Sequence, residues 1–262
     1  AAKFKTEYGK ALLPVEDFKI TISDEGQYDP PVLVSNKIPQ TPLKVVKADA
    51  ETGKRIPLAA SFELYDAYGG LVTYTLHYPD EEVVSTWTTN ERGELTLPMA
   101  LGEGCYFLKE VAAPEGYVLD SEPAAFAVSA DYRGWDDPIV LTFEDAPQKG
   151  TVTVSKTNSE TGSPVDGSTY IVKAEGDVST PDGTLRYADG QIVATLTTDA
   201  EGHATSEPLY LGTYTVYEAK AKDGYALDVA ENTVALTYQG QEASVFDERI
   251  DVADAPTELR LA

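Results

Sequence analysis

A spacing of 109 residues recurs along this chain and limits what it can fold into. The steps from residue 36 to 145 and from 145 to 254 are both 109 residues, and each position ends an apolar run. The lysines at 47 and 156 keep this step, and the glutamates at 110 and 218 keep one of 108. A unit of this length can hold its own hydrophobic core, so the repeat predicts tandem domains. The recurring residues are Asn36, Asp145 and Asp254; Lys47 and Lys156; and Glu110 and Glu218.

The repeat predicts two complete domains, at residues 41–148 and 149–258. Residues 1–40 are predicted to be the C-terminal strands of a preceding domain, and residues 259–262 the start of a further repeat. Short segments that contain proline, such as "EDAPQKG", connect the units. Linkers of this kind favour a semi-rigid row of domains over freely jointed ones.

The residue pattern within each unit predicts an all-β fold. Short alternating runs such as "SFELYDA" and "STYIVKA" are bounded by Gly, Pro, Asn or Asp, and no stretch keeps an apolar period of 3.6 residues. The segments "TTNERGEL" and "TTDAEGHA" place Asn or Asp three residues before Gly, which favours β-hairpins. We therefore expect tandem immunoglobulin-like β-sandwiches.

Composition excludes several classes of function. A net charge of −24 disfavours binding to nucleic acid or to anionic membranes. With Cys105 as the single cysteine, no disulfide can form within the chain. There is no G-x-S-x-G sequence, and the acidic loops do not fit an EF-hand, so we expect no hydrolase, metal or cofactor. No apolar run is long enough for a membrane helix, and we expect export and anchoring segments to lie outside this chain.

Strand alternation places the recurring ionisable residues on the inward side. Lys47 follows Leu43 and Val45 on one face of its run, and Asp145 and Glu110 also follow apolar residues on their faces. Burial lowers the pKa of a lysine and raises that of a carboxyl, so a neutral amine can face a protonated acid. Such an amine can attack the aspartate while the glutamate relays the proton, which gives an intramolecular Lys–Asp amide. The alternative is a buried ion-pair triad without a covalent bond.

Three motifs at the repeat spacing resemble a known domain family. "VVKADAETGKRIPLAASFEL" and "TVSKTNSETGSPVDGSTYIV" are similar to the opening of a Cna protein B-type (CnaB, prealbumin-like) domain. "GCYFLKEVAAPEGYVL" and "GTYTVYEAKAKDGYAL" resemble its E-box, and "VLVSNKIP", "LTFEDAPQKG" and "IDVADAP" its closing strand. The resemblance implies sortase-anchored adhesins or pilins of Gram-positive bacteria. It also implies reactive amines at Lys47 and Lys156 and catalytic acids at Glu110 and Glu218.

The acceptor residue departs from the usual family pattern. The family commonly uses Asn, which stands here at Asn36, in the truncated preceding domain. Asp145 and Asp254 occupy the acceptor position of the two complete domains, and Asp acceptors occur in the family. We therefore expect isopeptide bonds between Lys47 and Asp145 and between Lys156 and Asp254.

The sequence predicts a structural stalk of a cell-wall-anchored, extracellular adhesin or pilin-like protein, with no enzymatic turnover beyond formation of its own bonds. Its predicted partners are the sortase-linked wall or pilus, reached through regions outside this chain, and a host surface protein or glycan. A first alternative is a host-ligand binding module that uses loops at residues 66–83 and 173–190. A second is a spacer within a large extracellular enzyme.

Overall fold

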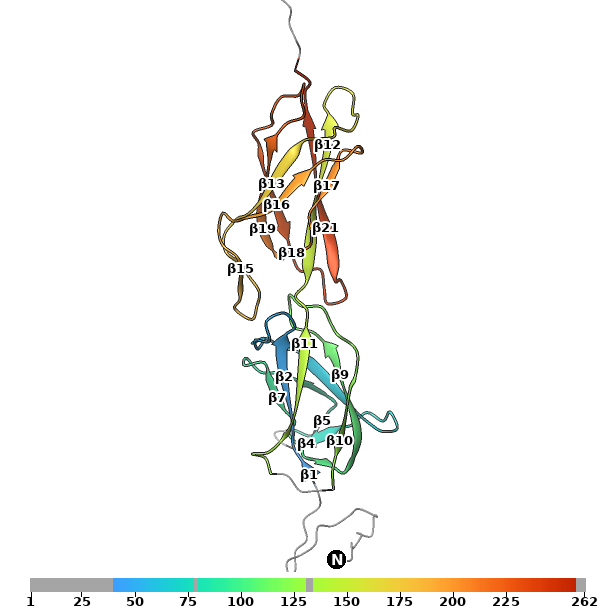
Figure 1. The fold of residues 1–262 in the computed structure, drawn as a ribbon. Helices are drawn as coiled ribbons and strands as arrows, with labels where there is room; N and C mark the ends of the chain where they lie inside the picture. The colour runs from blue at the N-terminus through green and yellow to red at the C-terminus, as the bar shows by residue number, and fades with distance from the viewer. Residues whose placement is uncertain (1–39, 78–79, 131–133, 258–262) are drawn as a thin grey trace, which may run out of the picture.

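The computed structural model describes residues 40–77, 80–130 and 134–257 of the 262-residue chain. All regular elements in these ranges are β-strands, so no described segment is a helix that could cross a membrane. The strands form two bodies that follow one another along one long axis (Figure 1). Asn36, with the rest of the predicted preceding unit up to residue 39, lies outside the described residues, as do residues 259–262.

The first body, here called the first domain, contains β1 to β11. A four-stranded sheet has the order β10-β9-β3-β6, and a three-stranded sheet has the order β11-β2-β7. Two short pairs, β1 with β8 and β4 with β5, complete the domain. The strands are β1 Gln40–Thr41, β2 Leu43–Asp49, β3 Ser61–Asp66, β4 Tyr74–Leu76, β5 Glu82–Val84, β6 Thr86–Thr88, β7 Glu94–Thr96, β8 Leu101–Gly102, β9 Gly104–Ala112, β10 Ala124–Val128 and β11 Ile139–Asp145.

The second body, the second domain, repeats this plan with β12 to β21. One sheet has the order β16-β13-β19-β20, and the other joins β12 to β17, β18 and β21. A further pair, β14 with β15, forms a hairpin at the end that faces the first domain (Figure 1). The strands are β12 Lys149–Asn158, β13 Thr169–Ala174, β14 Val178–Ser179, β15 Leu185–Tyr187, β16 Ile192–Thr197, β17 His203–Thr205, β18 Leu209–Tyr210, β19 Gly212–Lys220, β20 Glu231–Leu236 and β21 Val245–Asp254.

Each domain has its own hydrophobic core between its two sheets. In the first domain, Val45 of β2 and Phe143 of β11 belong to one buried cluster with Phe62 of β3 and Leu108 of β9. The rings of Phe62 and Phe143 meet edge to face, with centroids 4.9 Å apart. A separate cluster fills the second domain. The prediction of an all-β chain of tandem sandwiches is confirmed, whereas the limits 41–148 and 149–258 stay predictions.

In each domain, the strand that carries the lysine is a parallel neighbour of the last strand. In the first domain β11 pairs with β2, with Phe143 opposite Lys47 and Asp145 opposite Asp49. In the second domain β21 pairs with β12, with Val252 opposite Lys156. Residues two apart on a strand share a face. Each acceptor aspartate lies two residues beyond the residue opposite the lysine, and therefore on the same side of the sheet as the lysine.

Two glycine turns lie against the strands that carry these lysines. The φ angles of Gly93 and Gly202 are 67° and 75°. The backbone oxygen of Gly93 accepts a hydrogen bond from the N–H of Lys47 (2.8 Å), and that of Gly202 accepts one from Lys156 (2.7 Å). A Cβ atom at position 93 would lie 2.4 Å from the backbone oxygen of Ile56. These turns therefore need glycine for both conformation and space.

Replacing Gly93 by alanine should destabilise the first domain more than the same change at Gly53. Both glycines have positive φ, 67° and 68°, so both variants carry a cost of about 1–2 kcal/mol for the left-handed conformation. A Cβ atom on Gly53 meets nothing within 4 Å, unlike one on Gly93. We expect G93A to lower the free energy of unfolding of the first domain by about 3 kcal/mol, measured by denaturant titration. Equal losses in the two variants would contradict the steric argument.

Candidate functional site

The first candidate site lies between the two sheets of the first domain. Lys47 comes from β2, Asp145 from the end of β11, and Glu110 from β9 of the opposite sheet, and all three are buried. Lys47 Nζ lies 2.7 Å from Glu110 Oε2 and 2.5 Å from Asp145 Oδ1. The amine is thus in contact with both carboxyl groups in a place that water does not reach.

Burial sets the protonation of this site. It raises the pKa of Glu110 to about 8; the amine of Lys47 acts against the shift, and the charge of Asp145 adds to it. Burial also raises the pKa of Asp145, against the attraction of Lys47. Two buried carboxyls beside one amine therefore favour a state in which one carboxyl carries a proton. Glu110 Oε1 has no hydrogen-bond partner among the described residues, so this oxygen can hold that proton.

The second candidate site occupies the equivalent place in the second domain. Lys156 of β12 contacts Asp254 Oδ1 of β21, and its Nζ lies 3.6 Å from Glu218 Oε1 of β19. All three residues are buried, with at most 4% of their surface exposed. The structure therefore brings together the Lys, Glu and Asp of each complete repeat, from three strands of two sheets.

The two sites differ around the glutamate. Phe62 lies opposite Glu110 in the strand register, whereas Tyr170 lies opposite Glu218. The Tyr170 hydroxyl is 3.5 Å from Glu218 Oε1, and the backbone N–H of Asp228 donates to Glu218 Oε2 at 2.9 Å. Burial and the charge of Glu218 raise the pKa of Tyr170, so its hydroxyl remains a donor. The second glutamate thus has donors other than its lysine.

Sequence reasoning missed both of these donors. The strand registers make Tyr170 the counterpart of Phe62. The tyrosine in "STYIVKA", where "SFELYDA" has a phenylalanine, is the sequence signal that could have identified the first donor. Asp228 donates through its backbone N–H. Almost every residue type has this group, so the sequence gives no signal for it.

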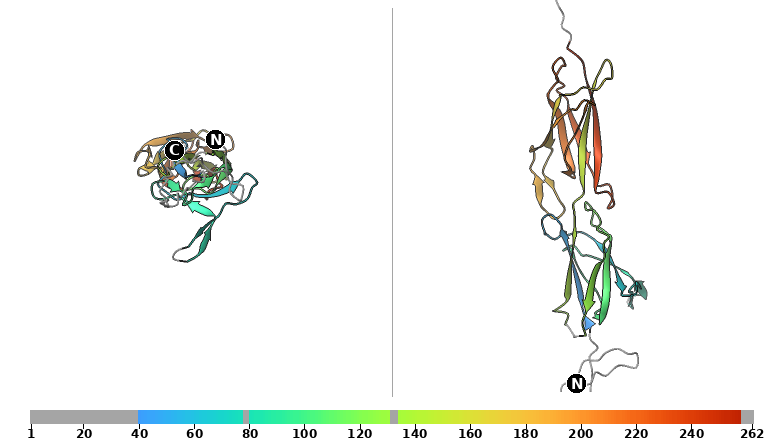
Figure 2. Two further views of the ribbon diagram at one scale, coloured as in Figure 1. Left: turned by 90° about the horizontal axis from the view of Figure 1, so that it is seen from below. Right: turned by 45° about the vertical axis from the view of Figure 1, so that its right-hand side comes forward.

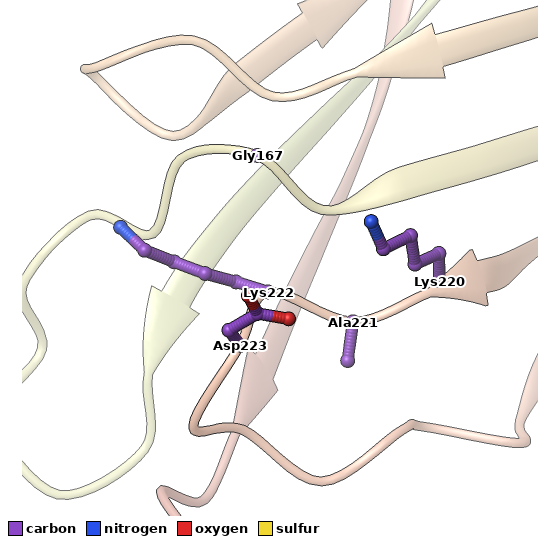
Figure 3. Close-up of a pocket in the computed structure, with 5 residues that line it drawn as sticks. All are labelled: Gly167, Lys220, Ala221, Lys222 and Asp223. Atoms are coloured by element: carbon purple, nitrogen blue, oxygen red, sulfur yellow. The ribbon is translucent and has the colours of Figure 1, made fainter.

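Other residues considered in the sequence lie away from these sites. Cys105, on β9, is exposed. Within the described ranges, no group of three or more His, Cys, Asp or Glu side chains is placed to hold a metal ion. An open pocket of about 210 Å³ lies in the second domain (Figure 3). Lys222, which lines it, also contacts Asp166. The lining of the pocket is Gly167, Lys220, Ala221, Lys222 and Asp223, none of which belongs to a Lys–Glu–Asp site.

The fold and the repeated site define a chain of tandem β-sandwich domains. A family model, the SpaA prealbumin-like fold domain, matches residues 41–135 and 150–249, which is more than half of the chain. The chain belongs to this prealbumin-like family and contains two of its domains. No curated protein matches the chain significantly.

Three solved structures illustrate what this chain is similar to. The Bacillus anthracis TIE protein is 21% identical over 84% of this chain and 35% of its own, with a TM-score of 0.56. A streptococcal ancillary pilin is 19% identical over 97% of this chain and 73% of its own (TM-score 0.36). The shaft pilin SpaA from Lactobacillus rhamnosus GG is 17% identical over 85% and 99% (TM-score 0.32). This chain spans about a third of the TIE protein chain, and that likeness supports the fold alone.

Proposed function

We propose that this chain is a structural section of an extracellular stalk, in an adhesin or pilin-like protein anchored to a Gram-positive cell wall. We further propose that both domains are of the CnaB type and that each forms a Lys–Asp isopeptide bond. The observation that carries this proposal is the buried contact of Lys47 Nζ with both Glu110 and Asp145. The amine and one carboxyl are the two reactants of an amide bond, and the other carboxyl can carry the proton. Burial holds all three groups in contact and away from water.

The reaction balances within the three side chains. Proton transfer leaves a neutral Lys47 amine, and Glu110 in its protonated form donates a hydrogen bond to the Asp145 carboxyl. The amine attacks Cγ of Asp145, Glu110 relays protons as the tetrahedral intermediate forms and collapses, and one water leaves. Glu110 ends unchanged, and the new bond joins Lys47 Nζ to Asp145 Cγ. The same steps apply to Lys156, Glu218 and Asp254.

The place of the proposed bond explains how it would serve a stalk. The chain enters the first domain through the two-residue β1 and then β2, and it leaves through β11; β2 and β11 are parallel neighbours. An amide between them would carry tension directly from the entry strand to the exit strand. It would also restrict the unfolded chain in the way that a disulfide around a long loop does, without being reducible.

The intact mass of the purified chain tests this function. Each domain should have lost one water, so the chain should weigh two waters less than its sequence requires. Peptide mapping should then recover Lys47 joined to Asp145 and Lys156 joined to Asp254. A mass equal to that of the uncorrected sequence would leave two buried ion-pair triads in place of the bonds.

Bond formation in the first domain should slow as the pH rises above about 8. Glu110 acts in its protonated form, and burial keeps this form populated up to a pKa of about 8, above which the carboxylate dominates. Chain that is synthesised and purified in denaturant, and so has never folded, can be refolded at several pH values, with bond formation followed by mass spectrometry. A rate that keeps rising through this range would show that protonation of Glu110 does not limit the reaction.

One observation favours an additional binding role. The hairpin of β4 and β5 projects sideways from the long axis of the molecule (Figure 2). It falls largely within the loop at residues 66–83 that was predicted as a ligand-binding alternative, and Tyr68 and Val83 there are 98% and 63% exposed. Deleting this hairpin should abolish binding of the first domain to a host matrix protein or glycan that the parent binds.

A further inference from the structure

The hairpin of β14 and β15 reaches from the second domain onto the first. Its end lies beside the loop that follows β2 (Figure 1). Thr52 Oγ1 donates to Asp182 Oδ2 (2.8 Å), and Lys54 Nζ donates to Thr184 Oγ1 (2.9 Å). We call these facing surfaces the joint; they consist of Asp49, Glu51, Thr52 and Lys54 of the first domain and Asp182, Thr184 and Arg186 of the second.

Arg186 is the centre of the joint. Its Nη2 lies 3.0 Å from Asp49 Oδ2, and its Nη1 lies 2.9 Å from Glu51 Oε2. Within its own domain, the guanidinium donates from Nε to Thr180 Oγ1 (2.9 Å) and stacks over the ring of Tyr210 at 4.5 Å. The cation is therefore held in position by its own domain before it meets the two carboxylates.

Further contacts lie beside this centre and at the opposite side of the connection. Glu51 also accepts from Lys149 Nζ (2.7 Å) and from the Tyr210 hydroxyl (2.6 Å). On the other side of the axis, the loop between β20 and β21 contacts the first domain (Figure 1). There Gln241 Oε1 accepts from the N–H of Ala113, and Gln148 Nε2 donates to the backbone oxygen of Gly240. Contacts on both sides of one connecting segment oppose bending in either direction.

The turn that follows β2 does not require the negative charge of Asp49. Asp49 Oδ1 accepts from the N–H groups of Glu51 and Thr52 and thereby fixes the turn after β2. At the equivalent place in the second domain, Asn158 Oδ1 accepts from the N–H groups of Glu160 and Thr161 in the same way. An uncharged amide therefore suffices for the turn.

The two domains differ at the other polar atom of this side chain, which is Oδ2 in Asp49 and Nδ2 in Asn158. Asp49 Oδ2 accepts from the Tyr117 hydroxyl (3.0 Å) and from Arg186, while Asn158 Nδ2 donates to the hydroxyl of Tyr225 (3.1 Å). Asp49 is fully buried, and a buried carboxylate is costly without an opposite charge. Among the described residues, the cation that pairs with Asp49 is Arg186 of the other domain.

We propose that the top of the first domain is a docking surface for the following domain, and that the Asp49–Arg186 ion pair fastens the two domains into one rigid unit. The partner it fits is a hairpin that presents an arginine held by a tyrosine ring. This inference does not depend on the proposed isopeptide bonds, because no residue of the joint belongs to a Lys–Glu–Asp site.

Electron spin resonance distance measurements on the full chain test the proposal. One spin label can occupy Cys105, which is exposed in the first domain, and a second can occupy T195C, an exposed position on β16. The parent should give one narrow distance distribution. D49N, which keeps the turn as Asn158 does, and R186A should each broaden it. We expect the ratio of docked to undocked molecules to fall by about 100-fold, the effect of leaving one partner of a buried ion pair unpaired.

R249A is the matched control, because Arg249 pairs with Asp251 on the surface of the second domain, away from the joint. It should leave the distribution narrow. Circular dichroism should show that D49N and R186A keep the strand content of the parent, so that broadening reports undocking. Narrow distributions in both D49N and R186A, unchanged from the parent, would overturn the proposal whatever the mass of the chain shows.

Discussion

Glu110→Ala is expected to return one water to the mass of the chain and to leave Lys47 with a free amine. Lys47 and Asp145 contribute the atoms of the proposed bond, whereas Glu110 only carries protons, so its loss stops the reaction and keeps both reactants. The domain should still fold, because Glu110 is not part of its apolar core. The proposed bond closes a loop of about a hundred residues, and the free energy of unfolding should fall by about 2–5 kcal/mol without it.

Two further variants separate lost chemistry from lost packing. Glu110→Gln keeps the volume and the hydrogen-bonding capacity but cannot relay a proton, so it should also lack the bond. Glu144→Ala changes an exposed carboxyl next to Asp145 and should still weigh two waters less than its own sequence requires. The linkage in the second domain should persist in all three variants. A Lys47–Asp145 linkage in the Glu110→Ala protein would show that this glutamate is not the catalyst.

Pulling on the two ends of the chain should reveal where tension travels. In the parent, force should pass through the Lys47–Asp145 amide, so the first domain should not lengthen by unfolding. In E110Q the chain between these residues is free to extend. It spans 98 residue steps (145 − 47 = 98), which correspond to about 320–350 Å of extended chain. A single-molecule force experiment should show one such step in E110Q and none in the parent.

The second domain provides the internal reference for this measurement. Its proposed bond spans the same number of steps (254 − 156 = 98), and it should stay closed in E110Q. A second full extension step in E110Q, or one in the parent, would contradict the proposed path of tension. Subjecting the same proteins to protease should give a parallel result, with cleavage of the first domain in E110Q under conditions that the parent survives.

The sequence was sufficient for the repeat, the all-β class and the inward face of each ionisable residue. Alternation along a strand has a period of two, so the apolar residues before Lys47 define its side of the sheet. The same reasoning applies to Glu110 and Asp145, and the structure places all three in the buried interior. The strand class and the inward faces are local properties that depend on residues close together in the chain, and the repeat is found by comparing the sequence with itself.

The tertiary structure decided which strands are neighbours and in what register. The parallel pairing of β2 with β11 sets Asp145 two residues beyond Phe143, the residue opposite Lys47. It also showed that Glu218 has donors in Tyr170 and Asp228 that differ from the surroundings of Glu110. Periodicity identifies the face of a strand but carries no information about the side chains that another sheet places against it.

The joint between the domains was likewise decided by tertiary structure alone. The loop at residues 173–190 was predicted as a ligand-binding alternative, yet its hairpin contacts the first domain through Arg186. Asp49 and Arg186 are 137 residues apart in the chain. The sequence repeat predicts the features that the two domains have in common, because each domain folds around its own core. Contacts between domains depend on single side chains outside the repeat pattern, and their meeting is fixed only when both domains are placed in space.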